Sequence, residues 1–416
     1  MIKELIVADD FTGGLDTGVM FAKNGFATWM SDDRSRLCGY SGDYVAVLDT
    51  ETRHLKKESA LEKLRKTAEF AREKKIPLLF KKTDSLLRGN LGAELEGMIL
   101  GSGRNLLVFA PAYPEMGRTV EEGRLFIEGK PLTAGSYADD LISSVQKNRV
   151  KDIVRAQTAI PIRETRLLDR PPVVGEKAEI YICDTTEEED FRMIAEAIKP
   201  VADQVILAGC GGFAKYISEY LAGTYIERKK QEPYRSVEYR GQTVFCGSVN
   251  GRTREQIKYA VEKGVFLYKL RPEEYLAEKS PERTARRLLA LQRRERQLLI
   301  CTVSEQEDIC RTVAYAKSRG IAEEELYGSI ASGLGQIAAA CMKDNERRGF
   351  SVVGGDTLYH TMEAAGYKVI RPVVPLREGA VLSKVYWKEG GARYLVSKAG
   401  SFGGNTAIWE LFQKEN

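Results

Sequence analysis

The chain has 416 residues, of which 43% are hydrophobic and 29% are charged, a composition typical of an ordinary globular protein. A chain of this length normally divides into two domains, each with its own hydrophobic core. The formal charge of +4 arises from 63 basic and 59 acidic residues, which excludes the strong basic bias of proteins that bind nucleic acid or anionic membranes through net charge.

The seven cysteines occur singly, with no pair at CxxC spacing, and the two histidines are His54 and His360. This pattern argues against a structural zinc site and against a disulfide framework. No apolar stretch approaches the roughly 20 residues that a membrane-spanning helix needs. The chain begins with a strand-like run rather than a signal sequence. We therefore expect a cytoplasmic protein with no membrane partner.

The first predicted strand runs from Leu5 to Ala8 and leads into the sequence Asp-Asp-Phe-Thr-Gly-Gly, with a helix expected from about Asp16. Asp9 and Asp10 stand side by side in this turn. Two carboxylates there suit a site that holds hydroxyl groups, coordinates a divalent cation or accepts a proton from an alcohol. A helix N-cap explains one of them but not both. Phosphatases of the haloacid dehalogenase type begin similarly, but their DxDx[TV] spacing is absent.

Two further predicted strands, 44–48 and 76–80, also end in polar turns, and a helix from Ala60 to Lys74 separates them. The first of these turns carries Arg53. The second is a ten-residue segment made of Lys81, Lys82, Thr83, Asp84, Ser85, Leu86, Leu87, Arg88, Gly89 and Asn90, and a helix is expected to start near its last residue. Open α/β sheets bind ligands at the carboxyl ends of their strands, so these cations indicate an anionic small molecule. A single such turn could equally be a solvated strand end with a capping residue.

A fourth strand, 106–110, leads into a turn that ends at Arg118. Arg53, Arg88 and Arg118 therefore follow three different strands, and each offers a planar fork suited to a carboxylate. A hairpin is expected at 123–131. The alternation of strands and amphipathic helices predicts an α/β fold with a mostly parallel sheet flanked by helices.

Later segments of the same half of the chain continue this pattern. Strands are expected at 178–183 and 204–208, and the second of them enters a glycine-rich turn at 209–215. A lone glycine cluster is weak evidence for a phosphate site, because close packing of a helix on its strand explains it equally well.

The sequence becomes polar and charged between residues 226 and 241, and we place the domain boundary there. The predicted division is a substrate-binding domain at 1–228, a linker at 229–240 and a nucleotide-binding domain at 241–416. We expect the active site in a cleft between the two domains.

The second half opens with a strand at 243–246, a turn that carries Ser248 and a helix from about Thr253. The arginines of 283–296 are interleaved with leucines and lack stacking aromatic residues. They therefore predict a helix with a solvated basic face rather than a nucleic-acid site.

Two later strands, 351–353 and 394–398, lead into glycine-rich turns at 354–357 and 399–404. Glycines allow backbone N–H groups to approach a phosphate. The Walker pattern GxxxxGK[ST] is absent throughout, as is the protein-kinase signature set, so a less familiar nucleotide fold is expected.

Together these segments resemble the two-domain four-carbon acid sugar kinases, and the resemblance covers nearly the whole chain. It rests on motifs that occur in the same order: Ala8 to Gly13, Asp49 to Arg53, Lys82 to Asn90, Pro111 to Arg118, Gly247 with Ser248, Gly354 to Thr357, and Lys398 to Gly403. It implies a carbohydrate kinase whose first domain binds threonate, erythronate or a 3-oxo-tetronate and whose second domain binds ATP. The phosphoryl group would pass to the terminal hydroxyl of the acid, with Mg²⁺ bridging phosphate oxygens. The expected partners are these small molecules and not nucleic acid, and a homo-oligomer is left open.

The chain departs from the family pattern at a few positions. Asp356 and Leu358 replace residues of the usual GGETSG turn, and Ala399 and Ser401 alter the usual KPGGFG turn. Cys210 stands where a serine is expected.

Site roles follow from the resemblance and from the residue chemistry together. The catalytic candidates are Asp10, preferred to Asp84 as the proton acceptor, and Lys82, which would offset developing phosphate charge. The substrate-binding candidates are Asp9, Arg53, Ser85, Arg88, Asn90 and Arg118, with Arg88 and either Arg53 or Arg118 on the carboxylate. The nucleotide-binding candidates are Ser248, Gly354, Gly355, Asp356, Thr357, Gly400 and Gly403. No metal ligand is assigned.

Two other classes of function remain open at this point. A hydroxy-acid dehydrogenase would also use arginines for a carboxylate, but it requires a GxGxxG fingerprint after a strand, which this sequence lacks. A non-catalytic sugar-acid binding protein would need the arginines but not the aspartate pair.

Overall fold

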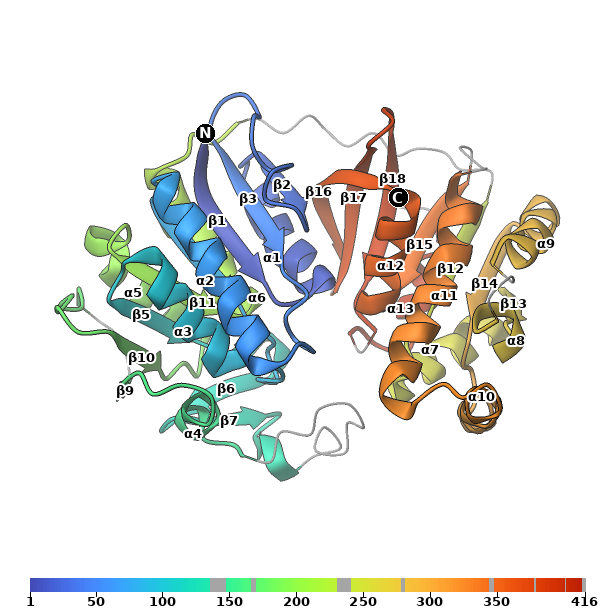
Figure 1. The fold of residues 1–416 in the computed structure, drawn as a ribbon, viewed down its shortest axis with the longest axis horizontal. Coiled ribbons are helices and arrows are strands. Elements are labelled where there is room, and N and C mark those ends of the chain that lie inside the picture. The colour runs from blue at the N-terminus through green and yellow to red at the C-terminus, as the bar shows by residue number, and fades with distance from the viewer. Residues whose placement is uncertain are drawn as a thin grey trace. The chain divides into compact units, whose positions relative to one another are not determined.

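The computed structural model describes residues 1–134, 147–165, 170–229, 241–277, 281–343, 348–377, 379–400 and 402–413. These residues form two compact units, 1–231 and 232–416. Each contains a mostly parallel sheet flanked by helices, which confirms the predicted α/β fold class (Figure 1). The predicted linker lies outside the described residues except for Lys229. Within the described ranges, no helix has the length and apolar character that crossing a membrane requires.

In the first unit the strand order is β2-β3-β1-β4-β11-β5-β10-β9, and neighbouring strands are parallel. The bounds are β1 Ile2–Ala8, β2 Thr28–Ser31, β3 Tyr44–Asp49, β4 Leu78–Lys82, β5 Leu106–Ala110, β9 Ile162–Thr165, β10 Glu179–Cys183 and β11 Val205–Gly209. The chain adds β2 and β3 on one side of β1 and then places β4 on the other side. Such a reversal opens a crevice beyond the carboxyl ends of the central strands, where parallel sheets bind ligands.

Helices cover both faces of this sheet: α1 Phe11–Lys23, α2 Lys57–Glu73, α3 Leu91–Ser102, α4 Val150–Arg155, α5 Glu188–Ile198 and α6 Gly211–Tyr216. Helices α2 and α3 pack against each other in front of the sheet in Figure 1, whereas α1 packs against α6. The contact between α2 and α3 is close because Gly97 and Gly101 lack side chains. A Cβ at these positions would lie 2.5 and 2.1 Å from backbone carbonyls of α2. The expected hairpin is a small antiparallel sheet of β6 Arg118–Glu121, β7 Arg124–Ile127 and β8 Lys130–Pro131.

Helix α1 begins earlier than the sequence pattern predicts, at Phe11 rather than near Asp16. Asp10 is extended and occupies the N-cap position, so Gly13 and Gly14 lie in the first turn of the helix and not in a flexible loop. Packing explains both glycines. A Cβ at Gly14 would lie 2.8 Å from the terminal methyl of Met30. The space that a Cβ at Gly13 would need is occupied by the side chains of Asp10 and Lys82.

In the second unit the strand order is β13-β14-β12-β15-β18-β17-β16. The bounds are β12 Gln242–Cys246, β13 Phe266–Lys269, β14 Gln297–Cys301, β15 Gly349–Val353, β16 Tyr367–Arg377, β17 Ala380–Trp387 and β18 Ala392–Lys398. The first five strands in this order, from β13 through β14, β12 and β15 to β18, are parallel to their neighbours. Strand β17 runs antiparallel to both β18 and β16. The chain reverses at β12, with β14 on one side and β15 on the other.

The long β16–β17 hairpin was not predicted. Pro372 and Pro375 interrupt the sequence pattern of β16, and both prolines stand where the pairing with β17 shifts register. Proline cannot donate to a strand ladder and is therefore found at such irregularities.

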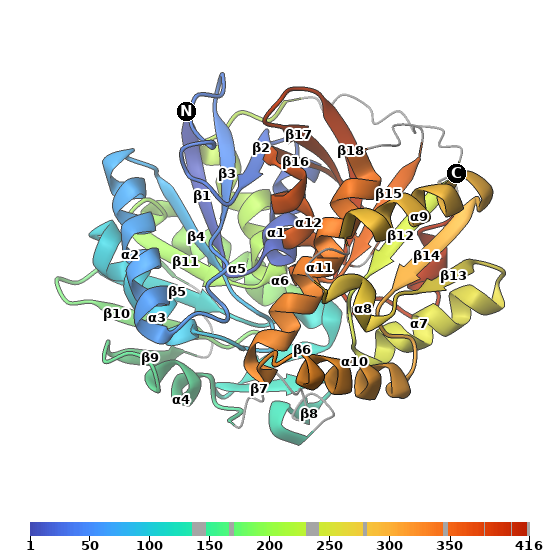
Figure 2. The ribbon, with the colours of Figure 1, turned by 45° about the vertical axis from the view of Figure 1, so that its right-hand side comes forward.

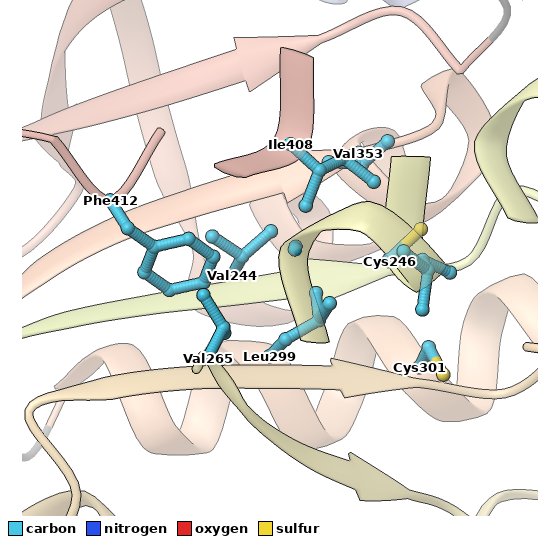
Figure 3. Packing of buried hydrophobic residues seen from close by; sticks show 10 residues of the cluster. Val244, Cys246, Val265, Leu299, Cys301, Val353, Ile408 and Phe412 are labelled. Carbon is cyan, nitrogen blue, oxygen red and sulfur yellow. The ribbon is translucent and has the colours of Figure 1, made fainter. Parts of the chain in front are cut away.

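The helices of the second unit are α7 Gly251–Glu262, α8 Pro272–Tyr275, α9 Pro281–Arg294, α10 Gln306–Ser318, α11 Glu323–Lys343, α12 Gly355–Ala365 and α13 Ala407–Glu410. The long helix α11 packs against α9 and α12 (Figure 2). Helices α7 and α13 pack together over a core of Val244, Cys246, Ile257, Ala260, Val265, Leu299, Cys301, Val353, Ile408 and Phe412 (Figure 3). Burial of Ile408 and Phe412 anchors the chain just beyond the turn that follows β18.

Candidate active site

Arg53 joins two strand ends of the first unit through its guanidinium group. Its Nε donates to Asp9 Oδ2 at 2.7 Å, and its Nη2 donates to Asp10 Oδ1 at 2.7 Å. The same Nη2 lies 3.8 Å from Asp84 Oδ1, which follows a third strand. Gly89 makes room for this arginine, because a Cβ there would lie 3.0 Å from Arg53 Cγ. The carboxyl ends of β3, β1 and β4 are thus held together by one cation.

Both carboxylate oxygens of Asp84 accept hydrogen bonds from Arg88. The Nε of Arg88 donates to Oδ2 at 2.7 Å and its Nη2 donates to Oδ1 at 3.0 Å, a bidentate pair. The backbone N–H groups of Leu86 and Arg88 also donate to Oδ2, each at 3.2 Å. Burial alone would raise the pKa of Asp84, but Arg88 and then Arg53 outweigh it and hold the pKa well below its usual value. Asp84 is therefore an ionised carboxylate that fixes the shape of its own turn.

Asp10 is the most exposed of the three aspartates, at 18% of its side chain against 3% for Asp9 and 9% for Asp84. Its Oδ2 accepts from Thr12 Oγ1 at 2.8 Å. Burial raises the pKa of Asp10, but Arg53, Lys82 and the Thr12 hydrogen bond together lower it below the ordinary value. Asp10 is therefore ionised at neutral pH and ready to accept a hydrogen bond from an alcohol.

Lys82, at the end of β4, lies beside Asp10. A Cβ at Gly13 would lie 2.4 Å from Asp10 Oδ1 and 2.8 Å from Lys82 Nζ, so the glycine leaves space that the two charges share. The ammonium group of Lys82 donates to the Thr83 carbonyl at 2.8 Å. A carboxylate and an ammonium group so close together can orient a hydroxyl group and balance a phosphate beside it.

Three other residues predicted to bind the substrate make contacts within the protein: Ser85, Arg118 and Asn90. Arg118 Nη1 donates to Ser85 Oγ, and both side chains are buried. The amide of Asn90 donates to the carbonyls of Thr52 and Leu55 at 2.9 and 2.7 Å. Asn90 therefore supports the turn that carries Arg53, and a direct substrate contact for it stays a prediction.

Sequence reasoning missed a buried ion pair beneath the site. Lys81 Nζ lies 2.9 Å from Glu94 Oε2 on α3, and both side chains are almost fully buried. Successive residues of a strand point to opposite faces, so Lys81 and Lys82 could have been separated from the sequence alone. Cys210 shows a second supporting contact, because its Sγ donates to the Ala112 carbonyl at 2.9 Å, as a serine hydroxyl would.

Asp49, at the end of β3, is a buried carboxylate to which the sequence analysis gave no role. It is 1% exposed, and its Oδ1 accepts from the Glu51 N–H at 3.2 Å. Its Oδ2 has no hydrogen-bond partner among the described residues. Burial, and secondarily the charge of Asp10, raise the pKa of Asp49 to about 7.

Asp49→Asn is expected to stabilise the protein increasingly as the pH rises from 5 to 8. In the wild type the folded state binds more protons at Asp49 than the unfolded state between about pH 4 and the folded pKa of about 7, so stability falls as pH rises through that window. The asparagine removes this loss, which amounts to up to roughly 4 kcal/mol, while keeping the acceptor for Glu51. Urea unfolding of both proteins at several pH values measures the difference.

The matched control is Asp33→Asn. The Ser35 hydroxyl holds the pKa of Asp33 below its ordinary value, outside this pH window. A free-energy difference for Asp49→Asn that stays constant from pH 5 to 8 would contradict the raised pKa.

In the second unit, the turns after β12, β15 and β18 meet. A Cβ at Gly247 would lie 2.0 Å from Thr357 Oγ1, and a Cβ at Gly400 would lie 2.4 Å from Ser248 Oγ. The Gly354 N–H donates to the Lys398 carbonyl at 3.0 Å. The hydroxyls of Ser248 and Thr357 therefore lie against the glycine turns.

Helix α12 starts directly after the second of these turns. Gly354 is its N-cap and has a φ of 110°, a backbone conformation that residues with a side chain rarely adopt. The helix extends over 11 residues. Its N-terminal N–H groups give an anion a place to bind. Leu358, one of the departures from the family pattern, is fully buried and belongs to the core rather than to the site. Ser401, another departure, lies outside the described residues.

Among the described residues, no group of three or more His, Cys, Asp or Glu side chains is arranged to hold a metal ion. Mg²⁺ in kinase sites is usually held by one or two carboxylates together with substrate phosphates. Asp356, in the first turn of α12, is an exposed carboxylate next to the glycine turns and fits that mode of binding.

The comparisons with known proteins find matches for both units of the chain. Residues 5–217 match a family model described as a sugar-binding N-terminal domain, and residues 243–408 match one described as a nucleotide-binding C-terminal domain. The D-threonate kinase of Salmonella typhimurium is 27% identical over 427 residues, which cover 98% of this chain and 97% of that protein. The D-erythronate kinase of Heliobacterium modesticaldum is 29% identical over 405 residues, which cover 90% of this chain and 89% of that protein.

The fold has a counterpart among solved structures. A crystal structure from Salmonella typhimurium LT2, provisionally described as a tRNA synthase, has a TM-score of 0.76 at 19% identity and covers 99% of this chain and 100% of that chain. At this identity the likeness supports the fold alone. The two domain matches occur in order and together take in most of the sequence, and the chain belongs to the four-carbon acid sugar kinase family.

Proposed function

We propose that this carbohydrate kinase transfers the γ-phosphoryl group of ATP to the terminal hydroxyl of threonate, erythronate or a 3-oxo-tetronate. The observation that carries the proposal is the position of Asp10 beside Lys82 at the chain reversal of the first sheet. Relatives named for threonate and erythronate support the class of acceptor. The two family matches support a sugar-binding first unit and a nucleotide-binding second unit.

Phosphoryl transfer of this kind needs alignment and charge balance more than covalent chemistry. Asp10 would accept the hydrogen bond of the terminal hydroxyl and receive its proton as the oxygen–phosphorus bond forms. Lys82 would balance the charge on the transferring group. Asp84 is the less suitable base, because both of its oxygens are engaged by Arg88.

The carboxylate of the acid would be bound at the other end of the site. Arg53 is shared between Asp9 and Asp10 and is 12% exposed, whereas Arg88 is paired with Asp84 but is 26% exposed. Arg88, together with Arg118, is therefore better suited to this role. Ser85, in contact with Arg118, would add a hydroxyl donor. This order of contacts would place the carboxylate away from Asp10, which suits transfer to the opposite end of a four-carbon chain.

The turns of the second unit would receive the phosphates of ATP. Gly355, Gly400 and Gly403 would contribute N–H groups, and Ser248 and Thr357 would contribute hydroxyls. The N–H of Gly354, also predicted as a donor, is used on the Lys398 carbonyl, so this glycine would shape the turn instead. Mg²⁺ would supply charge neutralisation between phosphate oxygens, with Asp356 as its protein ligand. Direct transfer requires phosphate and hydroxyl to meet during turnover, and an interdomain active site stays a prediction, as do the cytoplasmic location and any homo-oligomer.

A panel assay tests the proposal. The protein is incubated with ATP and Mg²⁺ and with the stereoisomers of threonate and erythronate and 3-oxo-tetronate, and ADP release is measured for each acid. We expect ADP release that depends on the acid, with a phosphorylated acid as the second product. Binding of an acid without ADP release would favour a non-catalytic binding protein. Oxidation of an acid with a nicotinamide cofactor would favour a dehydrogenase.

A further inference from the structure

The carbonyl oxygens of the turn after β18 face donors inside the protein. Lys398 Nζ donates to the carbonyls of Ala399 at 2.9 Å, Gly400 at 3.4 Å and Phe402 at 2.8 Å. Thr253 Oγ1, from α7, donates to the Gly400 carbonyl at 2.7 Å. Lys398 is 1% exposed, so a buried cation lies directly behind the turn.

Gln256, three residues after Thr253 on α7, forms hydrogen bonds with the later residues of the turn after β18. Its Nε2 donates to the carbonyls of Phe402, Gly403 and Gly404 at 3.1, 3.1 and 3.0 Å. The residue is fully buried, and its Oε1 has no hydrogen-bond partner among the described residues. A leucine would fill the same space without the desolvation cost of a buried amide. The contacts described for this side-chain amide therefore all hold the turn.

These contacts determine where the N–H groups of the turn point. In a trans peptide unit the N–H points opposite to the preceding C=O, and the described residues contain no cis peptide bond. Carbonyls of Ala399, Phe402 and Gly403 that face inward therefore turn the N–H groups of Gly400, Gly403 and Gly404 outward. None of these three N–H groups has a hydrogen-bond partner among the described residues. Residue 401 lies outside those residues and plays no part in this inference.

We propose that Gln256 is a positioning residue for nucleotide binding: it orients the turn after β18 so that its glycine N–H groups can bind the phosphates of ATP, with Thr253 and Lys398 in the same role. The inference rests on the proposed function, because it names residues that act behind the nucleotide site rather than in contact with the nucleotide. The Ser248 hydroxyl is hydrogen-bonded to Thr253 Oγ1 at 2.8 Å and extends the same network to the turn after β12.

Gln256→Leu tests this role. We expect the KM for ATP and the Kd for ADP to rise by about tenfold or more, because the turn loses the contacts that orient its donors. The KM for the sugar acid is expected to stay within about twofold, since no acid-binding residue is touched. Thr253→Val removes the donor to the Gly400 carbonyl together with the hydrogen bond to Ser248, and it leaves the Gln256 contacts in place. It is expected to give the same split, so the test does not depend on one variant folding.

Gln292→Leu is the matched control. Gln292 is a buried glutamine on α9 of the same unit, and neither polar atom of its side chain has a hydrogen-bond partner among the described residues. Its replacement is expected to leave the Kd for ADP unchanged. Equal ADP affinity in the wild type and in both turn variants would overturn the inference while leaving the kinase proposal intact. A wild-type protein that binds no ADP or ATP would overturn both.

Discussion

Asp10→Asn is expected to lower kcat by about two to four orders of magnitude, the range that loss of a general base produces. The amide keeps the size of the side chain and can still accept from Arg53, but it cannot take the proton of the acceptor hydroxyl. Arg53 and Lys82 hold the pKa of Asp10 below its ordinary value despite burial, so the base is ionised throughout the neutral range. The measurement is steady-state ADP release with saturating ATP and acid.

Asp84→Asn is the informative comparison for this experiment. Asp84 is bound by Arg88 on both oxygens, so its loss should act through the shape of the turn and should raise the KM for the acid as well as lower kcat. If Asp10→Asn kept wild-type turnover while Asp84→Asn abolished it, the base would be Asp84. A KM for ATP that rose as much as kcat fell in Asp10→Asn would point to a disturbed nucleotide site rather than to lost proton transfer alone.

Much of the first unit could be predicted from the sequence because its strands are short apolar runs, each of which ends in a polar turn. Parallel pairing then brings Asp9, Asp10, Arg53, Lys82 and Asp84 to one edge of the sheet. What the sequence could not show is which arginine would pair with which aspartate. Arg53 lies 44 residues from Asp9, and the geometry of their contact depends on how three strands align.

The remaining differences have local causes. The glycines after Asp10 indicate a loop when they are read for flexibility, but they are required by close packing inside α1. Asn90 has the chemistry of a ligand-binding residue, yet its amide is used on backbone carbonyls. Gln256 has no motif around it at all, because its role comes from facing a turn about 146 residues later in the chain.

The charge arrangement at the first site favours precise geometry over stability. Arg53 is largely buried, and burial alone would lower its pKa, but Asp10, Asp9 and Asp84 raise it well above the ordinary value. Removing two or more charges from water costs much of what their attraction returns, so such clusters are weak sources of net stability. Their value is that a single cation fixes the relative positions of three carboxylates.

Arg53→Met is accordingly expected to cost about 3–5 kcal/mol of unfolding free energy at pH 7 and to abolish turnover, because it leaves the carboxylates of Asp9 and Asp10 without their shared partner. The arginine contributes to the lowered pKa of Asp10 and Asp84. Groups with lowered folded pKa values add stability that is present above their unfolded pKa and is lost as the pH falls through the folded pKa. The deficit of the variant should therefore be largest at neutral pH and smaller near pH 3, where urea unfolding can be repeated.

The control for this prediction is Arg65→Met. Arg65 also pairs with two carboxylates, Glu62 and Glu69, but its side chain is 35% exposed on the surface of α2. Pairs of this kind contribute little to stability, because water and salt screen them. If the Arg53 and Arg65 variants lost similar amounts of stability, the buried cluster would not act as a unit. A clear difference between them, together with lost turnover only in Arg53→Met, would show that one arginine both assembles the site and keeps Asp10 in place to accept a proton.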